Sequence, residues 1–362
     1  MKLGVFLAIG ESFRDFKNHG QDKLFIDNNL RAYRERFDEI IVFSYENETG
    51  YLLPNVKLIP NKWKFHRYLY AFLLPLLHSL EIKKCDVFRG MQFSGGLPAL
   101  VAKIFYRKKF AINYGYNYVQ FSLIERKYLQ AFFYKIIEIF MLQFADLIFV
   151  PTGSVKKHVK HFTKSDKISM LPNGVDTNKF KPMKVNKKFD ILFVGRLERQ
   201  KNLFFLLDAI NKCKQKYKIT FIGNGSLKQQ LLSYAKKLKA SLNVIDSVSH
   251  DVLPKYLNKA RVFVLPSLAE GHPKALLEAL SCSLPVIASD IPGSKDIVVH
   301  KETGLLVSPT HVKELSSTID MVLTNKKLAK NIGDNGRRLI LNNYNLKKLF
   351  KKEISLLKHL VT

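Results

Sequence analysis

The sequence predicts an α/β protein with two doubly wound parallel sheets, and three observations lead to this fold class. Short apolar runs alternate with amphipathic helical patterns along the chain, which is typical of parallel α/β architecture. The chain has 362 residues, which favours two domains over a single core. Between two such series, residues 170–190 contain two prolines, an Asn-Gly pair and several lysines without helical or strand periodicity. We therefore expect a linker in this stretch.

The predicted strands are short apolar runs bounded by turn residues. In the first half of the chain they are residues 2–9, 39–45, 86–92, 109–115 and 146–152. In the second half they are residues 189–195, 217–223, 242–246, 261–267, 284–289 and 304–309. The amphipathic stretches between them predict the helices that cover the two sheets.

The composition is that of an ordinary globular protein except for its charge. Fifty-nine Lys and Arg residues against thirty Asp and Glu residues give a formal net charge of +29. This excess indicates polyanionic surroundings, such as nucleic acid, anionic lipid or phosphorylated substrates, or else the solvated surface of a protein from a lysine-rich proteome. No aromatic-and-basic stacking element or groove-reading motif is present, so we expect no nucleic-acid partner.

Cysteine usage and the lack of targeting segments favour a cytoplasmic protein. The three cysteines are scattered without metal-binding spacing, which favours a reducing compartment. The N-terminal apolar run stops at Glu11, too early for a secretion signal, and no window is apolar enough to span a membrane. Two aromatic and basic stretches, 62–84 and 125–143, either lie on the inner face of the membrane as amphipathic helices or pack on a core. The aromatic residues on which the membrane interpretation of the first stretch depends are Trp63, Phe65, Tyr68, Tyr70 and Phe72.

Two glutamates lie beside the end of the strand predicted at 261–267. Glu270 falls in the loop that follows this strand, and Glu278 lies about one turn into the helix predicted from Lys274. Open α/β sheets bind ligands at the carboxyl ends of their strands, and exposed helix N–H groups attract phosphates. Gly271 lets the backbone approach a ligand closely. The pattern predicts that both carboxylates bind hydroxyls of one polar ligand while the backbone between them faces its phosphates.

Two upstream loops bring basic and glycine residues to the same edge. The loop after the first strand of this domain contains Arg196 and Lys201, and the loop after the second reads Gly223-Asn224-Gly225. Arginine forks and lysine point charges commonly hold diphosphates. A single Gly-Asn-Gly is most often a turn, and a single surface cation is usually solvated. Their convergence on equivalent loops indicates a diphosphate site.

The motifs GRLERQKNL, GNG, EGHPKALLEAL, LPVIASDIPGSKDIV and GLLV, in this order and spacing, resemble the donor half of retaining GT-B-type glycosyltransferases of family 4. The resemblance covers about residues 168–345. It implies two Rossmann-like domains facing a cleft. The acceptor-side domain would be residues 1–168, joined by a C-terminal helix at 345–362, and the nucleotide-sugar-binding domain would be residues 169–344.

The resemblance also implies roles for single residues. In that family the residues matching Arg196 and Lys201 bind the donor diphosphate, the one matching Glu270 contacts sugar hydroxyls, and the one matching Glu278 contacts the ribose. Glu270, Arg196 and Lys201 are therefore the predicted catalytic residues. His272 stands where the family often has Phe, and it is either a ligand contact or a structural loop residue. The predicted donor-binding residues are Gly195, Gly223, Asn224, Gly225, Gly271, His272, Lys274, Leu276 and Glu278.

The first domain departs from the family pattern in two loops. The loop after the first strand reads GESFRDFKNHGQ where many members have Gly-Gly, and AINYGYNY lacks the histidine that many members place near the donor sugar. These departures leave the acceptor and the local catalytic detail open. The acceptor-side candidates that the two loops offer are Gly10, His19, Gly20, Gly115 and Tyr116.

The sequence predicts an enzyme that moves a hexose from a UDP- or GDP-linked sugar to an acceptor hydroxyl, with retention, on a lipid-linked or surface-glycan precursor. No carboxylate is placed as a nucleophile, which favours a same-face mechanism. No Asp-x-Asp element is present, so we expect neither a metal nor a cofactor. Two alternatives remain: a sugar-nucleotide epimerase or phosphorylase on the same fold, and a non-enzymatic basic protein that binds polyanions.

Overall fold

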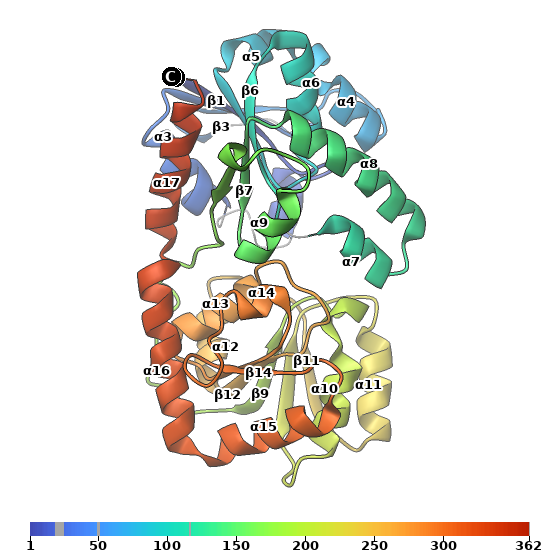
Figure 1. Cartoon of the computed structure of the whole chain (residues 1–362), viewed down its shortest axis with the longest axis vertical. Coiled ribbons are helices and arrows are strands. Elements are labelled where there is room, and N and C mark those ends of the chain that lie inside the picture. The colour runs from blue at the N-terminus through green and yellow to red at the C-terminus, as the bar shows by residue number, and fades with distance from the viewer. Residues whose placement is uncertain (19–24, 49–50, 116, 362) are drawn as a thin grey trace. The chain divides into compact units, whose positions relative to one another are not determined.

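In the computed structural model, the chain divides into two compact units (Figure 1). The structure describes residues 1–18, 25–48, 51–115 and 117–361. Unit 1 comprises Met1–Val119, Leu129–Pro172 and Lys347–Thr362, and unit 2 comprises Gln120–Tyr128 and Asn173–Leu346.

Unit 1 is built on an eight-stranded sheet. Its strands are β1 (Lys2–Phe6), β2 (Glu39–Phe43), β3 (Tyr51–Leu53), β4 (Val56–Ile59), β5 (Val87–Gly90), β6 (Lys109–Asn113), β7 (Leu147–Val150) and β8 (Ile168–Met170). The strand order is β3-β4-β2-β1-β5-β6-β7-β8, and all pairs are parallel except β3 with β4.

The helices of unit 1 cover both faces of this sheet (Figure 1). They are α1 (Phe13–Asn18), the π-helix η1 (Ile26–Leu30), α3 (Arg31–Arg34), α4 (Arg67–Leu77), α5 (Ser79–Lys84), α6 (Gly96–Tyr106), α8 (Tyr128–Phe144), α9 (Gly153–Val159), the 3-10 turn η2 (Ser165–Lys167) and α17 (Leu346–His359). A further helix, α7 (Tyr118–Ile124), spans the boundary between the units. Side chains alternate across the strands, so that Leu3 and Val5 enter one core and Phe6 enters the other.

Unit 2 is built on a six-stranded sheet that is parallel throughout. Its strands are β9 (Phe189–Val194), β10 (Lys218–Ile222), β11 (Ser241–Ile245), β12 (Ala260–Leu265), β13 (Val286–Ser289) and β14 (Leu305–Val307), in the order β11-β10-β9-β12-β13-β14. Its helices are η3 (Arg199–Lys201), α10 (Leu203–Asn211), α11 (Lys228–Lys237), α12 (Leu253–Lys259), α13 (Lys274–Ser281), α14 (Pro292–Lys295), α15 (Val312–Thr324) and α16 (Lys326–Asn343). Nearly continuous apolar runs such as that of β12 are expected where helices cover both faces of a parallel sheet.

Every strand predicted from the sequence is present in the structure, and three strands were not predicted. β3 and β4 form a short pair at one sheet edge, and β8 pairs with β7 at the other. Because residues 168–170 belong to the first sheet, the division at Pro172 falls after the expected boundary at residue 168. No named helix or strand lies between β8 and β9 in the described residues, as expected for a linker, but Val175 and Phe180 of this stretch are buried in the core of unit 2.

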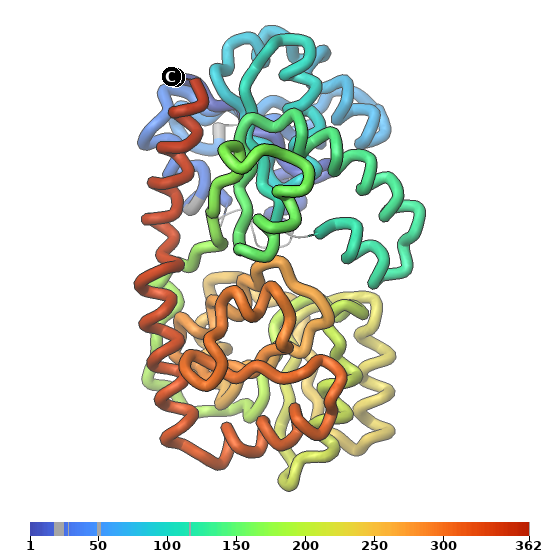
Figure 2. The backbone as a smooth tube through the Cα atoms, in the orientation of Figure 1, coloured from blue at the N-terminus to red at the C-terminus, as the bar shows by residue number. Residues whose placement is uncertain are grey.

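The C-terminal helix α17 packs on unit 1 through a buried ion pair. Arg89 of β5 is 1% exposed, and its Nε donates to Glu353 Oε1 at 2.6 Å. Tyr33 donates to the same oxygen at 2.9 Å, and its ring meets that of Phe350. Asn113 accepts a further bond from the guanidinium. The red helix therefore lies beside α3 in Figure 2, although the two are far apart in sequence.

Helices α4, α6 and α8 pack on the same core of unit 1 but expose large apolar side chains on their outer faces. In the stretch 62–84, some aromatic residues fit core packing and others fit an exposed surface. Tyr70 is buried and Trp63 packs on the core, whereas Phe65, Tyr68 and Phe72 are 40–48% exposed. No helix among the described residues is both long and apolar enough to cross a bilayer. We call the following exposed set the apolar face: Tyr68, Leu69, Phe72 and Leu76 of α4, Ile104 and Phe105 of α6, and Leu129, Phe132, Phe133, Ile136, Ile139, Phe140 and Phe144 of α8.

Candidate donor site at the carboxyl edge of the second sheet

The carboxyl ends of β9 and β12 lie side by side in the centre of the unit 2 sheet. From this pair the strand order runs outward in opposite directions, through β10 to β11 and through β13 to β14. Open α/β sheets bind ligands at such a switch point, because the loops after the two strands leave in opposite directions and open a crevice. These two loops carry the predicted catalytic residues Arg196, Lys201 and Glu270.

Lys201 and Glu270 form an ion pair at this edge. The Nζ atom of Lys201 lies 2.5 Å from Glu270 Oε1, and Ser267 Oγ donates to the same oxygen at 2.6 Å. The two charged side chains are only 13% and 7% exposed, so solvent screens the pair weakly. A lysine ammonium has three donors, and one bond to Glu270 leaves the others for a ligand oxygen.

The backbone around this ion pair is tied together by Gln200. Its backbone oxygen accepts from Leu268 N at 2.8 Å, and its side-chain Nε2 donates to Ala269 O at 2.7 Å. Gln200 is 3% exposed, so these bonds are shielded from water. They join the loop after β9 to the loop after β12 and fix the separation of Lys201 and Glu270.

Arg196 is exposed at the start of the same loop, and among the described residues it makes no hydrogen bond or ion pair. Its charge acts on Glu198: burial alone would raise the pKa of that carboxyl, but hydrogen bonds from Ser226 and the positive charge of Arg196 lower it. A guanidinium with uncommitted donors is suited to bidentate binding of a diphosphate.

The predicted glycines Gly195, Gly223 and Gly225 let two loops interlock. Gly223 has φ +144°, and a Cβ atom there would lie 2.0 Å from the carbonyl oxygen of Gly195. A Cβ at Gly225 would lie 2.4 Å from Leu197 O. The loops are further joined by Leu197 N, which donates to Asn224 O at 2.8 Å. These glycines therefore have a packing role, and their contact with a donor stays a prediction.

Glu278 of α13 is paired with a histidine that the sequence patterns did not single out. His250, in the loop between β11 and α12, lies with its Nε2 2.8 Å from Glu278 Oε1. Glu278 is 8% exposed as a residue. The sequence did not predict His250 or Ser267 as site residues, because neither belongs to a spaced motif. The only available signal was their position: His250 follows a predicted strand, and Ser267 is the last residue of one.

His272 is 6% exposed, and burial lowers the pKa of its imidazole to about 3, aided by the charge of Lys274. Its ring packs at 5.5 Å from that of Tyr344, its carbonyl accepts from Asn173 Nδ2, and its Nδ1 is buried without a partner among the described residues. A neutral imidazole at physiological pH follows, so His272 contributes no positive charge to the site.

Three further residues of the predicted donor site, Leu276, Lys274 and Gly271, have different surroundings. The side chain of Leu276 is fully buried in the core of unit 2, so the predicted donor contact would have to come from its backbone. Lys274 is exposed at the first position of α13, where the helix has no side-chain cap. Gly271 lies against Gly293 of α14, where a Cβ would come 2.8 Å from Gly271 O. Small residues thus let these two loops meet.

The acceptor-side candidates are only partly described. Gly10 follows β1 with φ +84°, and a Cβ there would lie 3.1 Å from Arg67 Cδ. A Cβ at Gly115 would meet no described atom within 4 Å. His19, Gly20 and Tyr116 lie outside the described residues.

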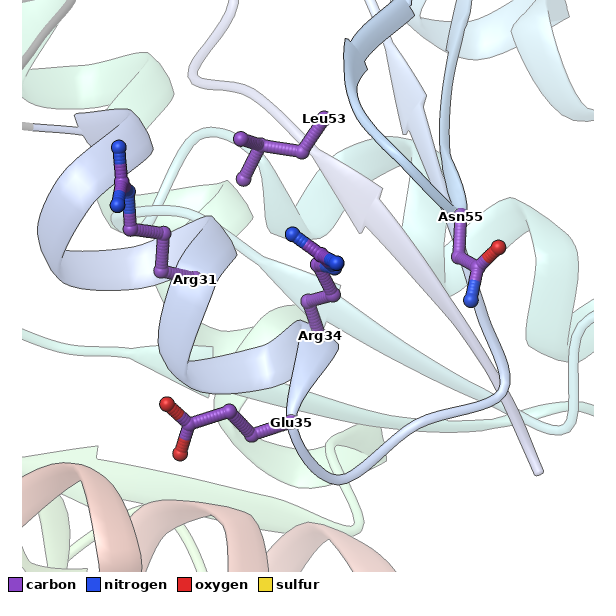
Figure 3. A pocket seen from close by; sticks show the side chains of 5 residues that line it. All are labelled: Arg31, Arg34, Glu35, Leu53 and Asn55. Carbon is purple, nitrogen blue, oxygen red and sulfur yellow. The ribbon is translucent and has the colours of Figure 1, made fainter.

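A pocket of about 610 Å³ lies elsewhere, in unit 1 (Figure 3). Arg31, Arg34 and Glu35 border it from α3 and its end, and Asn55 borders it from the turn between β3 and β4. Its charged side chains are exposed, and Arg31 is already paired with Asp27 at 2.9 Å. We therefore place the candidate site at the carboxyl edge of the unit 2 sheet, where Lys201 and Glu270 are largely buried and form an ion pair. The described residues also contain no cluster of three or more His, Cys, Asp or Glu side chains that could hold a metal ion.

The chain is similar to several known glycosyltransferases. A family model described as Glycosyl transferases group 1 matches residues 174–339, and one described as Glycosyltransferase Family 4 matches residues 25–179. The chain is also similar to the UDP-Gal:alpha-D-GlcNAc-diphosphoundecaprenol alpha-1,3-galactosyltransferase of Escherichia coli, at 31% identity over 205 residues, 51% of this chain and 52% of that protein. The alignments span about half the length of the curated relatives, 41%, 52% and 55% for three of them.

Solved structures extend the likeness to the whole chain. A sucrose-phosphate synthase from Thermosynechococcus elongatus matches with a TM-score of 0.85 and 17% identity over 99% of both chains. Anabaena HepE in complex with UDP-glucose matches with a TM-score of 0.79 and 17% identity over 99% of this chain and 100% of that one. The predicted fold class, two parallel α/β domains of the GT-B type, is confirmed.

Proposed function

The chain belongs to the glycosyltransferases of group 1 and family 4, and from this premise we propose that it transfers a hexose from a UDP- or GDP-linked sugar to an acceptor hydroxyl. The proposal includes retention at the anomeric carbon and independence from metal ions and cofactors. The observation that carries it is the Lys201–Glu270 ion pair at the switch point of the unit 2 sheet, with exposed Arg196 in the same loop as Lys201.

Each of these residues has a role that fits its surroundings. Arg196 and the remaining donors of Lys201 bind the diphosphate and stabilise its charge as the bond to the sugar breaks. Glu270, oriented by Lys201 and Ser267, accepts hydrogen bonds from sugar hydroxyls. Because Glu270 is held by two donors, it is a poor nucleophile. This favours a same-face displacement, in which the acceptor hydroxyl attacks on the side that the diphosphate leaves.

We propose a lipid-linked or surface-glycan precursor as the acceptor. The name of the Escherichia coli relative specifies a diphosphoundecaprenol-linked acceptor and a UDP-Gal donor, which makes this pair the first to test. A lipid-linked acceptor requires the protein to work at a membrane surface, and the high positive charge suits an anionic one.

The apolar face of unit 1 supports peripheral binding to such a surface. On α8, Leu129, Phe132, Ile136 and Phe140 recur at helical spacing and are 40–72% exposed, while the opposite side of the helix packs on the core. Exposed apolar surface of this extent marks an interaction site in soluble proteins. In unit 2 the exposed large apolar side chains are single residues scattered over several elements.

Exposed cations lie close in sequence to the helices that carry the apolar face. Lys62 and Lys64 precede α4, Lys83 and Lys84 end α5, and Arg107 follows α6. Each basic residue near an anionic leaflet contributes about 1 kcal/mol of attraction, and burial of apolar area contributes about 25 cal/mol per Å². We therefore propose that α4, α6 and α8 dock on the anionic inner face of the membrane.

A transfer assay tests the enzymatic proposal. The protein is incubated with UDP-galactose, UDP-glucose, UDP-N-acetylglucosamine or GDP-mannose and with N-acetylglucosaminyl-diphosphoundecaprenol, and the lipid product is weighed by mass spectrometry. We expect the mass of one added sugar with one of these donors. Release of free sugar, or a requirement for inorganic phosphate, would instead support the epimerase or phosphorylase alternative.

A matched pair of double variants locates the diphosphate site. Replacing Arg196 and Lys201 by Ala removes two charged hydrogen-bonding groups and should weaken nucleoside diphosphate binding by about 2 kcal/mol or more. Replacing Lys236 and Lys237 of α11 by Ala removes the same charge from an exposed helix and should leave binding unchanged. Equal calorimetric affinities in the two variants would place the diphosphate elsewhere.

A further inference from the structure

His250 and Glu278 come from different elements but form one hydrogen-bonded unit. His250 lies between β11 and α12, Glu278 lies on α13, and the Nε2–Oε1 distance is 2.8 Å. Their side chains are 20% and 11% exposed. The second carboxylate oxygen of Glu278 accepts no hydrogen bond from the described residues and is not among their buried unpaired atoms. It is therefore open to a ligand.

The surroundings of His250 determine which ring nitrogen carries the proton. An ionised carboxylate only accepts hydrogen bonds, so Nε2 must be the donor to Glu278. Nδ1 is buried and has no partner among the described residues. A proton on Nδ1 would leave a buried N–H without an acceptor, at a considerable cost in free energy. The geometry thus favours Nε2–H as the donor to Glu278.

Phe180 fixes the plane of this ring. The two ring centroids lie 4.8 Å apart, and Phe180 is fully buried. The backbone oxygen of Phe180 is itself held by Ser281 Oγ at 2.6 Å and by Arg337 Nη1 at 3.0 Å. The segment expected to be a linker therefore supplies the side chain that orients His250.

We propose that His250 is a positioning residue for nucleotide recognition: its Nε2–H holds the Glu278 carboxylate in the orientation that accepts both ribose hydroxyls. This inference rests on the proposed function, which supplies a nucleotide as the ligand. A carboxylate free to rotate would lose orientational entropy on binding a diol, whereas one already held by His250 loses less. Replacing His250 should therefore weaken recognition of the ribose hydroxyls and leave recognition of the diphosphate intact.

The test compares ligands with and without those hydroxyls. Dissociation constants of UDP and 2′,3′-dideoxy-UDP are measured by calorimetry for the wild type, Glu278→Gln, His250→Ala, His250→Gln and His250→Asn, and GDP with its dideoxy analogue serves if UDP does not bind. The side-chain nitrogen of Gln reaches about as far as imidazole Nε2, whereas that of Asn corresponds to Nδ1. Gln and Asn are therefore matched variants that differ only in reach.

We expect the wild type to prefer UDP over its dideoxy analogue roughly tenfold or more, and His250→Ala and His250→Asn to lose most of that preference. His250→Gln should retain it, and dideoxy-UDP should bind all His250 variants about equally. If His250 had only a structural role, its replacement would weaken the binding of UDP and of dideoxy-UDP equally. This result would overturn the inference. So would a preference that survives in His250→Asn. Failure of both UDP and GDP to bind the wild type would instead refute the proposed function, which distinguishes the two failures.

Discussion

At the scale of single residues, the charged groups at the β9–β12 edge are restrained before any ligand arrives. Lys201 and Ser267 hold Glu270, and His250 holds Glu278. Arg196 is exposed and uncommitted. Binding of a diphosphate must therefore order the Arg196 side chain, whereas the two carboxylates already have defined positions.

The two glutamates should respond differently to the same substitution. Glu278→Gln should weaken binding of both the sugar donor and the free nucleoside diphosphate, because the ribose is common to both. Glu270→Gln should spare the free nucleotide and reduce transfer, because only the sugar contacts that side chain. Calorimetry with free nucleotide and the transfer assay separate these outcomes. Identical behaviour of the two variants in both measurements would refute this division of roles.

His272 should make the stability of unit 2 depend on pH. In the unfolded chain this histidine protonates near pH 6.5, whereas burial in the folded state lowers the pKa to about 3. Between these values the unfolded state binds more protons, so the stability that His272 contributes is complete above pH 6.5 and is lost as the pH falls. From pH 7.5 to 5.5 the free energy of unfolding should decrease by about 1 kcal/mol more in the wild type than in His272→Phe.

Urea denaturation of both proteins at the two pH values measures this difference. His78, whose pKa burial also lowers, is common to both proteins, so its contribution cancels in the comparison. Parallel losses of stability in the wild type and in His272→Phe would contradict the prediction.

The sequence predicts those site residues whose chemistry follows from a local pattern. Lys201 and Glu270 were expected at one edge because each follows a recognisable strand, and the structure brings them into contact. The His250–Glu278 pair could not be anticipated, since nothing local connects a loop after β11 to α13. The burial of the Leu276 side chain could not be anticipated, because position within a motif does not tell which way a helical side chain points.

At the scale of elements, the same limit explains the strands that were missed. β8 has three residues, too few to show periodicity, and β3 and β4 form a short edge pair. The longer runs of β9 and β12 were predictable because both faces of their sheet are covered, which makes them apolar throughout. For α8 the periodicity indicated a helix but left open which apolar side faces the core. The structure shows apolar residues on both sides.

The outer side of α8 should determine binding to membranes. Replacing Phe132 and Phe133, which are 61% and 54% exposed, by Glu should abolish co-sedimentation with vesicles containing phosphatidylglycerol at low salt. The substitutions remove apolar area and add two negative charges near an anionic surface. Wild-type binding should fade as salt rises, since the attraction is screened within a Debye length.

Two exposed apolar residues of unit 2, Met321 and Leu341, provide the matched control. They are 42% and 39% exposed, and replacing both by Glu adds the same charge to the other unit. That variant should sediment like the wild type. Equal loss of binding in the two double variants would show that net charge, rather than the apolar face, governs attachment. Wild-type protein that stays in the supernatant with anionic vesicles would refute attachment altogether.

At the scale of the whole molecule, transfer should proceed without a divalent cation. Arg196 and Lys201 supply positive charge for the diphosphate, and the described residues offer no carboxylate cluster that could hold a metal beside it. We expect the transfer rate to be unchanged by EDTA. Loss of activity in EDTA, with recovery on addition of magnesium or manganese, would reverse this expectation.

The stability of unit 1 should depend strongly on the Arg89–Glu353 pair. Glu353→Ala leaves a buried guanidinium without its carboxylate and should cost about 3 kcal/mol or more in the free energy of unfolding. Asp27→Ala, which removes the exposed partner of Arg31 in the same unit, should cost less than about 1 kcal/mol. Denaturant unfolding monitored by circular dichroism compares them. Similar losses would mean that α17 is not anchored through this pair.

The Arg89–Glu353 pair also has a consequence for synthesis on the ribosome. Arg89 emerges early, but its partner follows 264 residues later, after all of unit 2 has been translated. Until then the nascent first sheet contains a guanidinium with no carboxylate to neutralise it. Unit 2 has no such dependence, because its last residue, Leu346, precedes Glu353 in the chain. We therefore expect the second half of the polypeptide to reach its native state first. A stalled nascent chain that lacks α17, and that carries a flexible linker long enough to fill the exit tunnel, should show protease resistance in unit 2 alone.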